Sequence, residues 1–366
     1  MTIAEKIIKP IKGGIFRTIF LYTGQGESTL LVIPTGAGAG DYMYVLVDSD
    51  MDKEPDEIDL VEMFKDLFKT SGELSTFINT HPHNDHIGGI KDIYEEIDFK
   101  EVWHSNHKPG SKHKDKYEDL KYVIDKVGKS NEYFLLGTND INAVRTSSDV
   151  KVVKKLGNID YHILSPANYL CDDINDEDQN TRDDRIHEQC GVIKFTYGKY
   201  AKSILITGDS DKAAWKDHIT EHHKANLPSY VLSASHHGSR TFFKTNEEDK
   251  DTYETHIENI KPVYVIISAP KQEDSPYGHP HNDAMDLYKK HVEEDNIFHL
   301  GKNLESVIVD IDEDGNVEIT FDKELVEEYG KGNDDEGGED DGNKTRDYSS
   351  IYVGSQTTKI DNKPNG

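Results

Sequence analysis

The chain has 366 residues, and its 42 Lys and Arg residues against 70 Asp and Glu residues give a formal net charge of −28 at pH 7. This length suffices for one large domain or two ordinary ones, and the charge argues against a protein that bulk electrostatics hold on nucleic acid. No apolar run approaches the roughly 18 to 20 residues that span a bilayer, and the N-terminal sequence MTIAEKIIKPIKGG lacks the apolar core of a signal peptide. We therefore expect a cytoplasmic protein without a membrane span, whose two cysteines, Cys171 and Cys190, are reduced thiols.

Apolar residues alternate with a period of two in the first part of the chain, which predicts an antiparallel meander of strands. Beyond it, stretches with helical spacing alternate with short apolar runs. Two β-rich halves with helices on the outside predict an α/β layered sandwich. The predicted strands are 14–23, 29–33, 43–47, 75–79, 101–104, 161–164, 192–197, 203–207, 230–233 and 263–268, with a final hairpin across Asp314-Gly315. The predicted helices are 57–69, 87–97, 114–126, 211–223, 253–260 and 283–294.

Two segments do not match a packed core. Residues 172–184 are dominated by Asp, Asn and Glu, which predicts a surface loop. We expect one folded domain over residues 1–325 and an acidic, disordered tail over 326–366, rich in Gly, Asp and Asn from Lys331 onward.

The strongest chemical signal is the sequence THPHNDHIGG at residues 80–89, which directly follows the predicted strand 75–79. Positions two apart on an extended loop face the same way, so His81 and His83 converge on one point. Asp85 and His86 turn toward a neighbouring point, where a helix begins. The spacing therefore predicts two adjacent metal sites, and the alternative is a polar surface loop with incidental histidines.

This loop resembles the signature of the metallo-β-lactamase superfamily. Four more motifs and one strand narrow the resemblance to the soluble metallohydrolase domain of the competence protein ComEC and its stand-alone relatives. The matching segments are GQGES at 24–28, VLVD at 45–48, LITGD at 205–209, SHHGSRT at 235–241 and YGHPH at 277–281. The resemblance runs from about residue 14 to residue 321, and it implies the αββα four-layer sandwich of that superfamily.

Asp209 follows an apolar strand and a glycine that permits a tight turn. The resemblance implies that its carboxylate bridges two cations, whereas the alternative is a cap for the helix that starts at Asp211. One member of the pair His236 and His237 should complete the second metal site, and the other should act as an acid or hold the substrate. We assign His236 to the metal and His237 to catalysis, although His279 competes for the last ligand position.

One departure from the close relatives is informative. Where they have an Asn-x-x-Ser element, this chain has His187-Glu188-Gln189-Cys190. The wider superfamily places a first-site histidine in this region, so His187 either restores that ligand or is an exposed histidine at the end of an acidic loop.

Substrate contacts are expected on the later motifs. Ser239 and Arg240 offer donors for an anionic group, and His279 lies on the next loop. The basic stretch HSNHKPGSKHKDK at residues 104–116 either guides a phosphate backbone or is a solvated loop.

Imidazoles and carboxylates suit two divalent metal ions, with zinc expected and manganese or iron tolerated. Such a pair activates a shared water, and Asp85 would both bind the second metal and orient the resulting hydroxide. The resemblance implies a phosphodiester substrate, DNA or a nucleotide, but the net charge points the other way. The alternatives are a hydrolase of small esters, lactones or thioesters, or a metal-binding module without turnover that docks a protein partner.

Overall fold

The protein is described from a computed structural model. Its described residues are 1–36, 38, 40–51, 56–69, 72–111 and 113–330. The part of the predicted tail from residue 331 to 366 lies outside these residues. Within them, no helix has both the length and the apolar composition that a membrane crossing needs.

Two β-sheets form the centre of the molecule. The first sheet has ten strands, in the order β16 (Val317–Asp322), β15 (Ser306–Asp312), β1 (Ile15–Phe20), β2 (Thr29–Pro34), β3 (Tyr42–Val47), β4 (Leu74–Asn79), β5 (Phe99–His104), β6 (Glu132–Phe134), β7 (Ala143–Thr146) and β8 (Lys151–Val153). The second has six, in the order β14 (Ile297–His299), β13 (Tyr264–Ile267), β12 (Val231–Ser233), β11 (Lys202–Ile206), β10 (Val192–Tyr197) and β9 (Asp160–Ser165). The predicted antiparallel meander of β1 to β3 and the final hairpin of β15 and β16 are confirmed.

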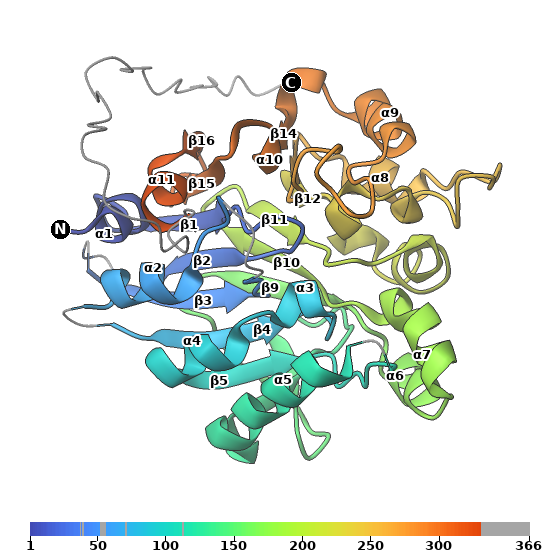
Figure 1. Cartoon of the computed structure of the whole chain (residues 1–366), viewed down its shortest axis with the longest axis horizontal. Helices are drawn as coiled ribbons and strands as arrows, with labels where there is room; N and C mark the ends of the chain where they lie inside the picture. The colour runs from blue at the N-terminus through green and yellow to red at the C-terminus, as the bar shows by residue number, and fades with distance from the viewer. Residues whose placement is uncertain (37, 39, 52–55, 70–71, 112, 331–366) are drawn as a thin grey trace, which may run out of the picture.

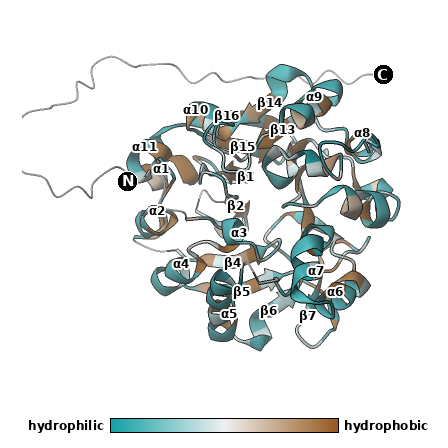
Figure 2. Ribbon diagram, turned by 45° about the vertical axis from the view of Figure 1, so that its right-hand side comes forward, coloured by the Kyte–Doolittle hydropathy of each residue, from teal (hydrophilic) through white to brown (hydrophobic). Residues whose placement is uncertain are grey.

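Helices cover the outer faces of the sheets (Figures 1 and 2). On the side of the first sheet lie α1 (Ile3–Ile8), α2 (Leu60–Leu67), α4 (Ile90–Glu96), α5 (Lys114–Val127) and α11 (Glu324–Tyr329). On the other side lie α6 (Asn168–Asn175), α7 (Gln179–Arg185), α8 (Thr255–Ile260), α9 (Asn282–His291) and the π-helical turn η3 (Ala214–Ile219). The short helices α3 (Asn84–Ile87) and α10 (Leu300–Asn303) complete the set of α-helices in the described residues. The architecture is the predicted αββα sandwich.

The alternation of side chains along a strand explains the layers. In β11, Ile204 and Ile206 join the larger apolar cluster together with residues of the first sheet, such as Phe16. Leu205, between them, points to the opposite face and joins the smaller cluster with Trp215. Because successive strand residues face opposite sides, one buried strand supplies both the inter-sheet core and the helix-covered core.

Three expectations need correction. The predicted loop 172–184 carries the end of α6 and most of α7, because Leu170 and Ile174 lie four residues apart and are buried, and because Asp178 caps α7 by accepting hydrogen bonds from two backbone amides. The helix predicted at 211–223 is mainly a π-helical turn at Ala214–Ile219. Helix α11 runs across the expected domain boundary at residue 325, and its Tyr329 is buried, so the packed chain extends to at least that residue.

Candidate metal centre

The candidate site lies where several strands end at the same edge of the two sheets. β4 leads into the THPHNDHIGG loop, β11 leads into Asp209, and β12 leads into the turn η5 (Ser235–Gly238). β10 runs antiparallel to β11 with Ile193 opposite Ile206, which places the preceding turn η2 (Ile186–Gln189) beside the end of β11. Gly208 permits close contact there, since a Cβ on it would lie 2.7 Å from Oγ1 of Thr80.

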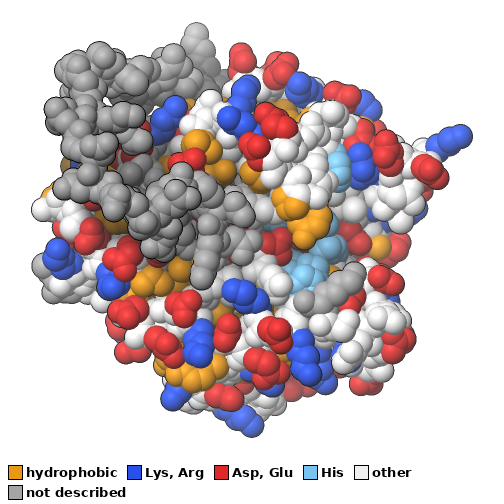
Figure 3. Space-filling view, in the orientation of Figure 1, with side chains coloured by type: hydrophobic (Ala, Val, Ile, Leu, Met, Phe, Trp, Pro, Cys, Tyr) orange, Lys and Arg blue, Asp and Glu red, His pale blue; other side chains and the backbone are white. Residues whose placement is uncertain are grey.

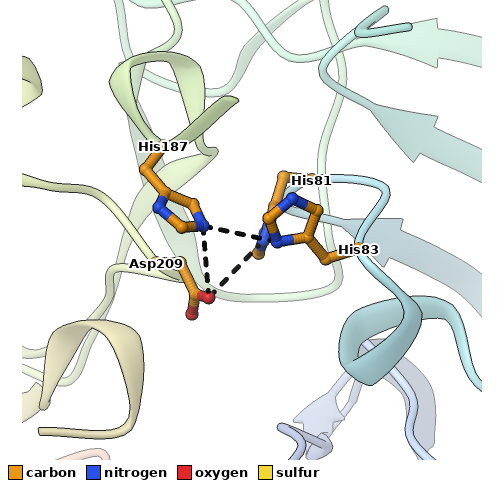
Figure 4. A group of neighbouring side chains, drawn as sticks. All are labelled: His81, His83, His187 and Asp209. Carbon is orange, nitrogen blue, oxygen red and sulfur yellow. Dashed lines mark hydrogen bonds and ion pairs between the residues drawn. The ribbon is translucent and has the colours of Figure 1, made fainter. Parts of the chain in front are cut away.

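A first group of side chains consists of His81, His83, His187 and Asp209, whose potential ligand atoms all lie within 4.8 Å of one another (Figure 4). Oδ2 of Asp209 lies 3.6 Å from Nε2 of His81 and 3.7 Å from Nε2 of His187. Nε2 of His187 lies 3.3 Å from Nδ1 of His83. The structure thus brings His187 to the histidines of the loop, which are more than a hundred residues away in the sequence.

A second group consists of Asp85, His86, His237 and the same Asp209, again within 4.8 Å. Here the other carboxylate oxygen, Oδ1 of Asp209, lies 3.1 Å from Nε2 of His86 and 3.5 Å from Nε2 of His237. Nε2 of His237 is also 3.5 Å from Oδ2 of Asp85. Asp209 therefore presents one oxygen to each group, as a ligand shared by two cations must do.

The donor set fits two divalent cations. Nε2 of His81, His86 and His237 and Oδ1 of Asp209 are buried and make no hydrogen bond within the described residues. Such atoms are costly to bury unless something binds them. The separations of 3.1 to 3.7 Å between facing donor atoms match the spacing of about 3.3 Å between neighbouring ligands around a tetrahedral ion with bonds of about 2.0 to 2.1 Å.

The charges of this site are strongly coupled. Burial alone would raise the pKa of Asp209, but the facing imidazoles hold it well below its usual range. Burial would lower the pKa of His237, yet Asp209 and Asp85 raise it to about 9. Burial would also lower the pKa of His86, yet Asp209 and Asp48 raise it well above its usual value. In the absence of a cation, protons therefore compensate the carboxylates of the second group.

Asp48 orients His86 from behind. Nδ1 of His86 donates to Oδ2 of Asp48 at 2.8 Å, which leaves Nε2 of His86 directed at Asp209. Thr80 anchors the carboxylate through its backbone amide at 2.7 Å and its hydroxyl at 2.6 Å. In the sequence, Asp48 was recognised only as the end of a strand that matches the ComEC relatives. Its position at the carboxyl end of β3, parallel to β4, was the signal for its role.

Glu27, in the GQGES turn, also lies beside the second group, a position that the sequence did not predict. Its carboxylate is buried beside Asp48 and His86, and these three form a further group of potential ligand atoms. Ser233 donates to Oε1 of Glu27 at 2.6 Å, and the backbone amide of Glu27 donates to the carbonyl of Asp85 at 3.1 Å. Burial raises the pKa of Glu27.

The structure distinguishes the two consecutive histidines. His237 is buried in the second group, and its Nδ1 donates to the carbonyl of Ser268 at 2.9 Å. His236 lies outside both groups, with Nε2 at 3.5 Å from Oδ2 of Asp209 and Nδ1 at 2.9 Å from the hydroxyl of Thr241. The geometry thus places His237, not the expected His236, among the potential ligands of the second group.

The turn that carries this pair is strained. His236 and His237 have φ values of +53° and +56°, a region that costs energy for residues with a Cβ. His279 is buried next to them, with its ring 5.2 Å from that of His236 and 6.1 Å from that of His237. It is absent from both groups of potential ligands.

Ser239 and Arg240, the other two residues expected to contact the substrate, form hydrogen bonds within the protein. The hydroxyl of Ser239 is buried and accepts a hydrogen bond from the amide of Thr241 at 3.3 Å. Nε of Arg240 donates to both oxygens of Asp283, at 3.1 and 3.2 Å. Arg240 therefore ties the turn to the first turn of α9.

The basic stretch 104–116 borders the first group through one histidine. The ring of His113 stacks on that of His83 with centroids 4.0 Å apart, and Nδ1 of His113 accepts the amide of Asn84 at 3.2 Å. His104 and His107 of the same stretch are buried. Figure 3 shows that histidine side chains gather at one place on this face of the molecule.

The two β-sheets, the covering helices and the paired His and Asp groups, together with the family match given next, are those of a metal-dependent hydrolase. The family model of the metallo-β-lactamase superfamily matches residues 44–241, more than half of the chain. The chain therefore belongs to the metallo-β-lactamase superfamily. A search of curated protein sequences gave no match.

Solved structures with a similar fold have low sequence identity. CmlA, a diiron β-hydroxylase from Streptomyces venezuelae, is 13% identical over 79% of this chain and 53% of its own, with a TM-score of 0.43. This chain thus spans about half the length of CmlA. Igni18, a metallohydrolase from Ignicoccus hospitalis, is 14% identical over 80% of this chain and 98% of its own, with a TM-score of 0.40. The long form of RNase Z from yeast is 12% identical over 72% of this chain and 38% of its own, also with a TM-score of 0.40.

Proposed function

We propose that the protein is a phosphodiesterase or nuclease with a dinuclear metal site, similar to the soluble metallohydrolase domain of ComEC. The observation that supports this proposal is the sharing of Asp209 between two groups of ligand atoms, one oxygen facing each group. A dinuclear site suits phosphodiester hydrolysis because attacking and leaving oxygens both develop charge.

Seven residues would hold the two cations. His81, His83 and His187 would bind the first, Asp85, His86 and His237 would bind the second, and Asp209 would bind both. Two bound cations would supply a shared water with a pKa near about 7 and stabilise the charge that forms on the phosphoryl group. The donors are imidazoles and carboxylates, and the thiol of Cys190 points instead toward the carbonyl of Ile186. We therefore propose zinc, with manganese or iron as substitutes.

The chain's own groups would handle the protons. Asp85 faces His237 with one oxygen, and its side chain is 24% exposed, so its other oxygen can accept a hydrogen bond from an attacking water. His236 is 19% exposed and is fixed at Nδ1 by Thr241, which leaves Nε2 available to the substrate. We assign His236 the contact with the leaving oxygen, which reverses the roles that the sequence suggested for the pair.

The substrate class rests on the ComEC-like motifs. They run in order through the folded chain, from the GQGES turn to the YGHPH loop. The net charge of −28 favours instead a small substrate such as an ester, lactone or thioester, which makes that class the second candidate.

One experiment separates the two candidates. The protein is purified without added metal, analysed for its elements, and assayed against bis-p-nitrophenyl phosphate, p-nitrophenyl acetate and a lactone. About two metal ions per chain and turnover of the phosphodiester alone support the proposal. Turnover of the ester or lactone alone favours the second candidate, and bound metal without turnover favours a docking module.

A further inference from the structure

The loop between β13 and α9 carries an exposed aromatic ring beside the histidine cluster. Tyr277 is 65% exposed, and its ring centroid lies 5.8 Å from that of His279. The ring of His279 lies in turn 5.2 Å from His236 and 6.1 Å from His237. A single buried imidazole therefore separates the exposed ring of Tyr277 from the residues around the metal centre.

Hydrogen bonds hold the backbone of this loop in one arrangement. The hydroxyl of Ser275 accepts the amides of Tyr277 at 3.3 Å and His279 at 3.0 Å, and it donates to Oε1 of Gln25 at 2.6 Å. The side-chain nitrogen Nε2 of Gln25 donates to Nδ1 of His279 at 3.2 Å. The side chain of Gln272 closes the other side of the loop by donating to two of its carbonyls, at 3.2 and 2.9 Å. The aromatic ring is thus attached to a prearranged support, which lowers the entropic cost of binding.

We infer that Tyr277 is the surface on which a base of the substrate stacks, so that the substrate is a nucleotide-containing phosphodiester. This inference rests on the proposed function and deepens it. In a nucleotide one sugar separates the base from the phosphate. One imidazole ring, that of His279, likewise separates Tyr277 from the residues that flank the metal centre, so a base could stack on Tyr277 while its phosphate lies at the metals. Every base presents a flat π face, so stacking on tyrosine tolerates any sequence.

The charge of the chain supports this mode of binding. Proteins that hold nucleic acid by its phosphates need a positive surface, and this chain has a net charge of −28. Arg240, which was expected to contact an anion, is bound to Asp283, and the described part of the stretch 104–116 borders the first group through the ring of His113. Stacking supplies affinity without net positive charge, which reconciles an acidic surface with a nucleotide substrate.

The test compares two substrates that share a leaving group. Thymidine 5′-(p-nitrophenyl phosphate) and ethyl p-nitrophenyl phosphate differ only in the nucleoside, so any stacking of the nitrophenyl ring cancels in the ratio of their kcat/KM values. For Tyr277→Ala in the metal-loaded protein, we expect this ratio to fall by about 5- to 150-fold. Tyr277→Phe should keep the ratio, because the ring face remains.

Tyr200→Ala is the matched control. Tyr200 is also 65% exposed but lies in the turn between β10 and β11, at the opposite end of β11 from Asp209. It should leave the ratio unchanged. A second readout is the equilibrium binding of thymidine monophosphate and methyl phosphate by calorimetry, in which Tyr277→Ala should weaken only the former.

The outcomes distinguish a failure of base stacking on Tyr277 from a failure of the proposed phosphodiesterase activity. An equal loss with both substrates would show that Tyr277 supports the loop, and no loss with either would remove it from binding; both overturn this inference and leave the phosphodiesterase proposal standing. If the unmodified protein binds thymidine monophosphate no better than methyl phosphate, base recognition is overturned irrespective of the kinetics. If it hydrolyses neither substrate, the proposed function itself fails.

Discussion

Nδ1 of His86 lies 2.8 Å from Oδ2 of Asp48, and both side chains are completely buried. The carboxylate can only accept, so Nδ1 carries the proton and Nε2 is presented to the second group. A partner of this kind fixes both the tautomer and the orientation of a metal-binding imidazole.

Replacing Asp48 by Asn should therefore weaken the second metal site. We expect the affinity for one of the two ions to fall by about 10- to 100-fold, measured by competition with a chelator during metal titration. Asp125→Asn, on the exposed face of α5, is the control and should behave as the unmodified protein. If the same chelator concentration removed the metal from the unmodified protein, Asp48→Asn and Asp125→Asn, this role of Asp48 would be excluded.

Asp85→Ala should abolish most turnover while the fold persists. The side chain of Asp85 is 24% exposed and contributes no apolar packing, whereas it faces His237 at 3.5 Å. Loss of a group that orients water and binds a cation should lower kcat by about 10²- to 10⁴-fold. Steady-state assays and circular dichroism of Asp85→Ala and of the exposed control Asp92→Ala test this, and an unchanged kcat would remove Asp85 from the mechanism.

His187→Ala should bind about one metal ion per chain instead of about two. Nε2 of His187 lies 3.7 Å from Asp209 and 3.3 Å from His83, so its loss leaves the first group with two imidazoles. Excess metal should restore part of the activity. Elemental analysis after dialysis gives the number of metal ions per chain, and His222→Ala, at an exposed histidine, is the control. Two tightly bound ions in His187→Ala would show that the first site takes its remaining ligand elsewhere.

Metal affinity should rise with pH up to about 9. Without a cation, the pKa of His237 is raised to about 9 because Asp209 and Asp85 outweigh the opposing effect of burial. Below that pH a cation must displace this proton, and the raised pKa of His86 adds a second proton to be displaced, so the affinity of the second site should increase by at least about tenfold per pH unit. Calorimetry in buffers of different ionisation enthalpy should show proton release at pH 7. Binding at pH 7 without proton release would contradict this expectation.

Local sequence patterns were sufficient to predict the candidate metal ligands of the THPHNDHIGG loop. His81, His83, Asp85 and His86 lie within six residues, so the geometry of one strand end and one short helix determines their directions. The same local rules identified the meander of β1 to β3 and the layered sandwich. They missed α7, whose capping Asp178 lies in an acidic stretch that by composition resembles a loop.

The roles of His187, His236 and His237 depended on the tertiary structure. The antiparallel register of β10 and β11 places η2 beside Asp209 and so brings His187 to the loop histidines. Two consecutive residues with positive φ turn His237 inward and leave His236 at the edge of the site. Neither fact is encoded in a local periodicity, because strand pairing and backbone strain arise from contacts between residues far apart in the chain. The sequence alone therefore identified the candidate ligands of the THPHNDHIGG loop, and only the packing of the two sheets decided which other side chains lie beside them and how all of these are divided between the two groups.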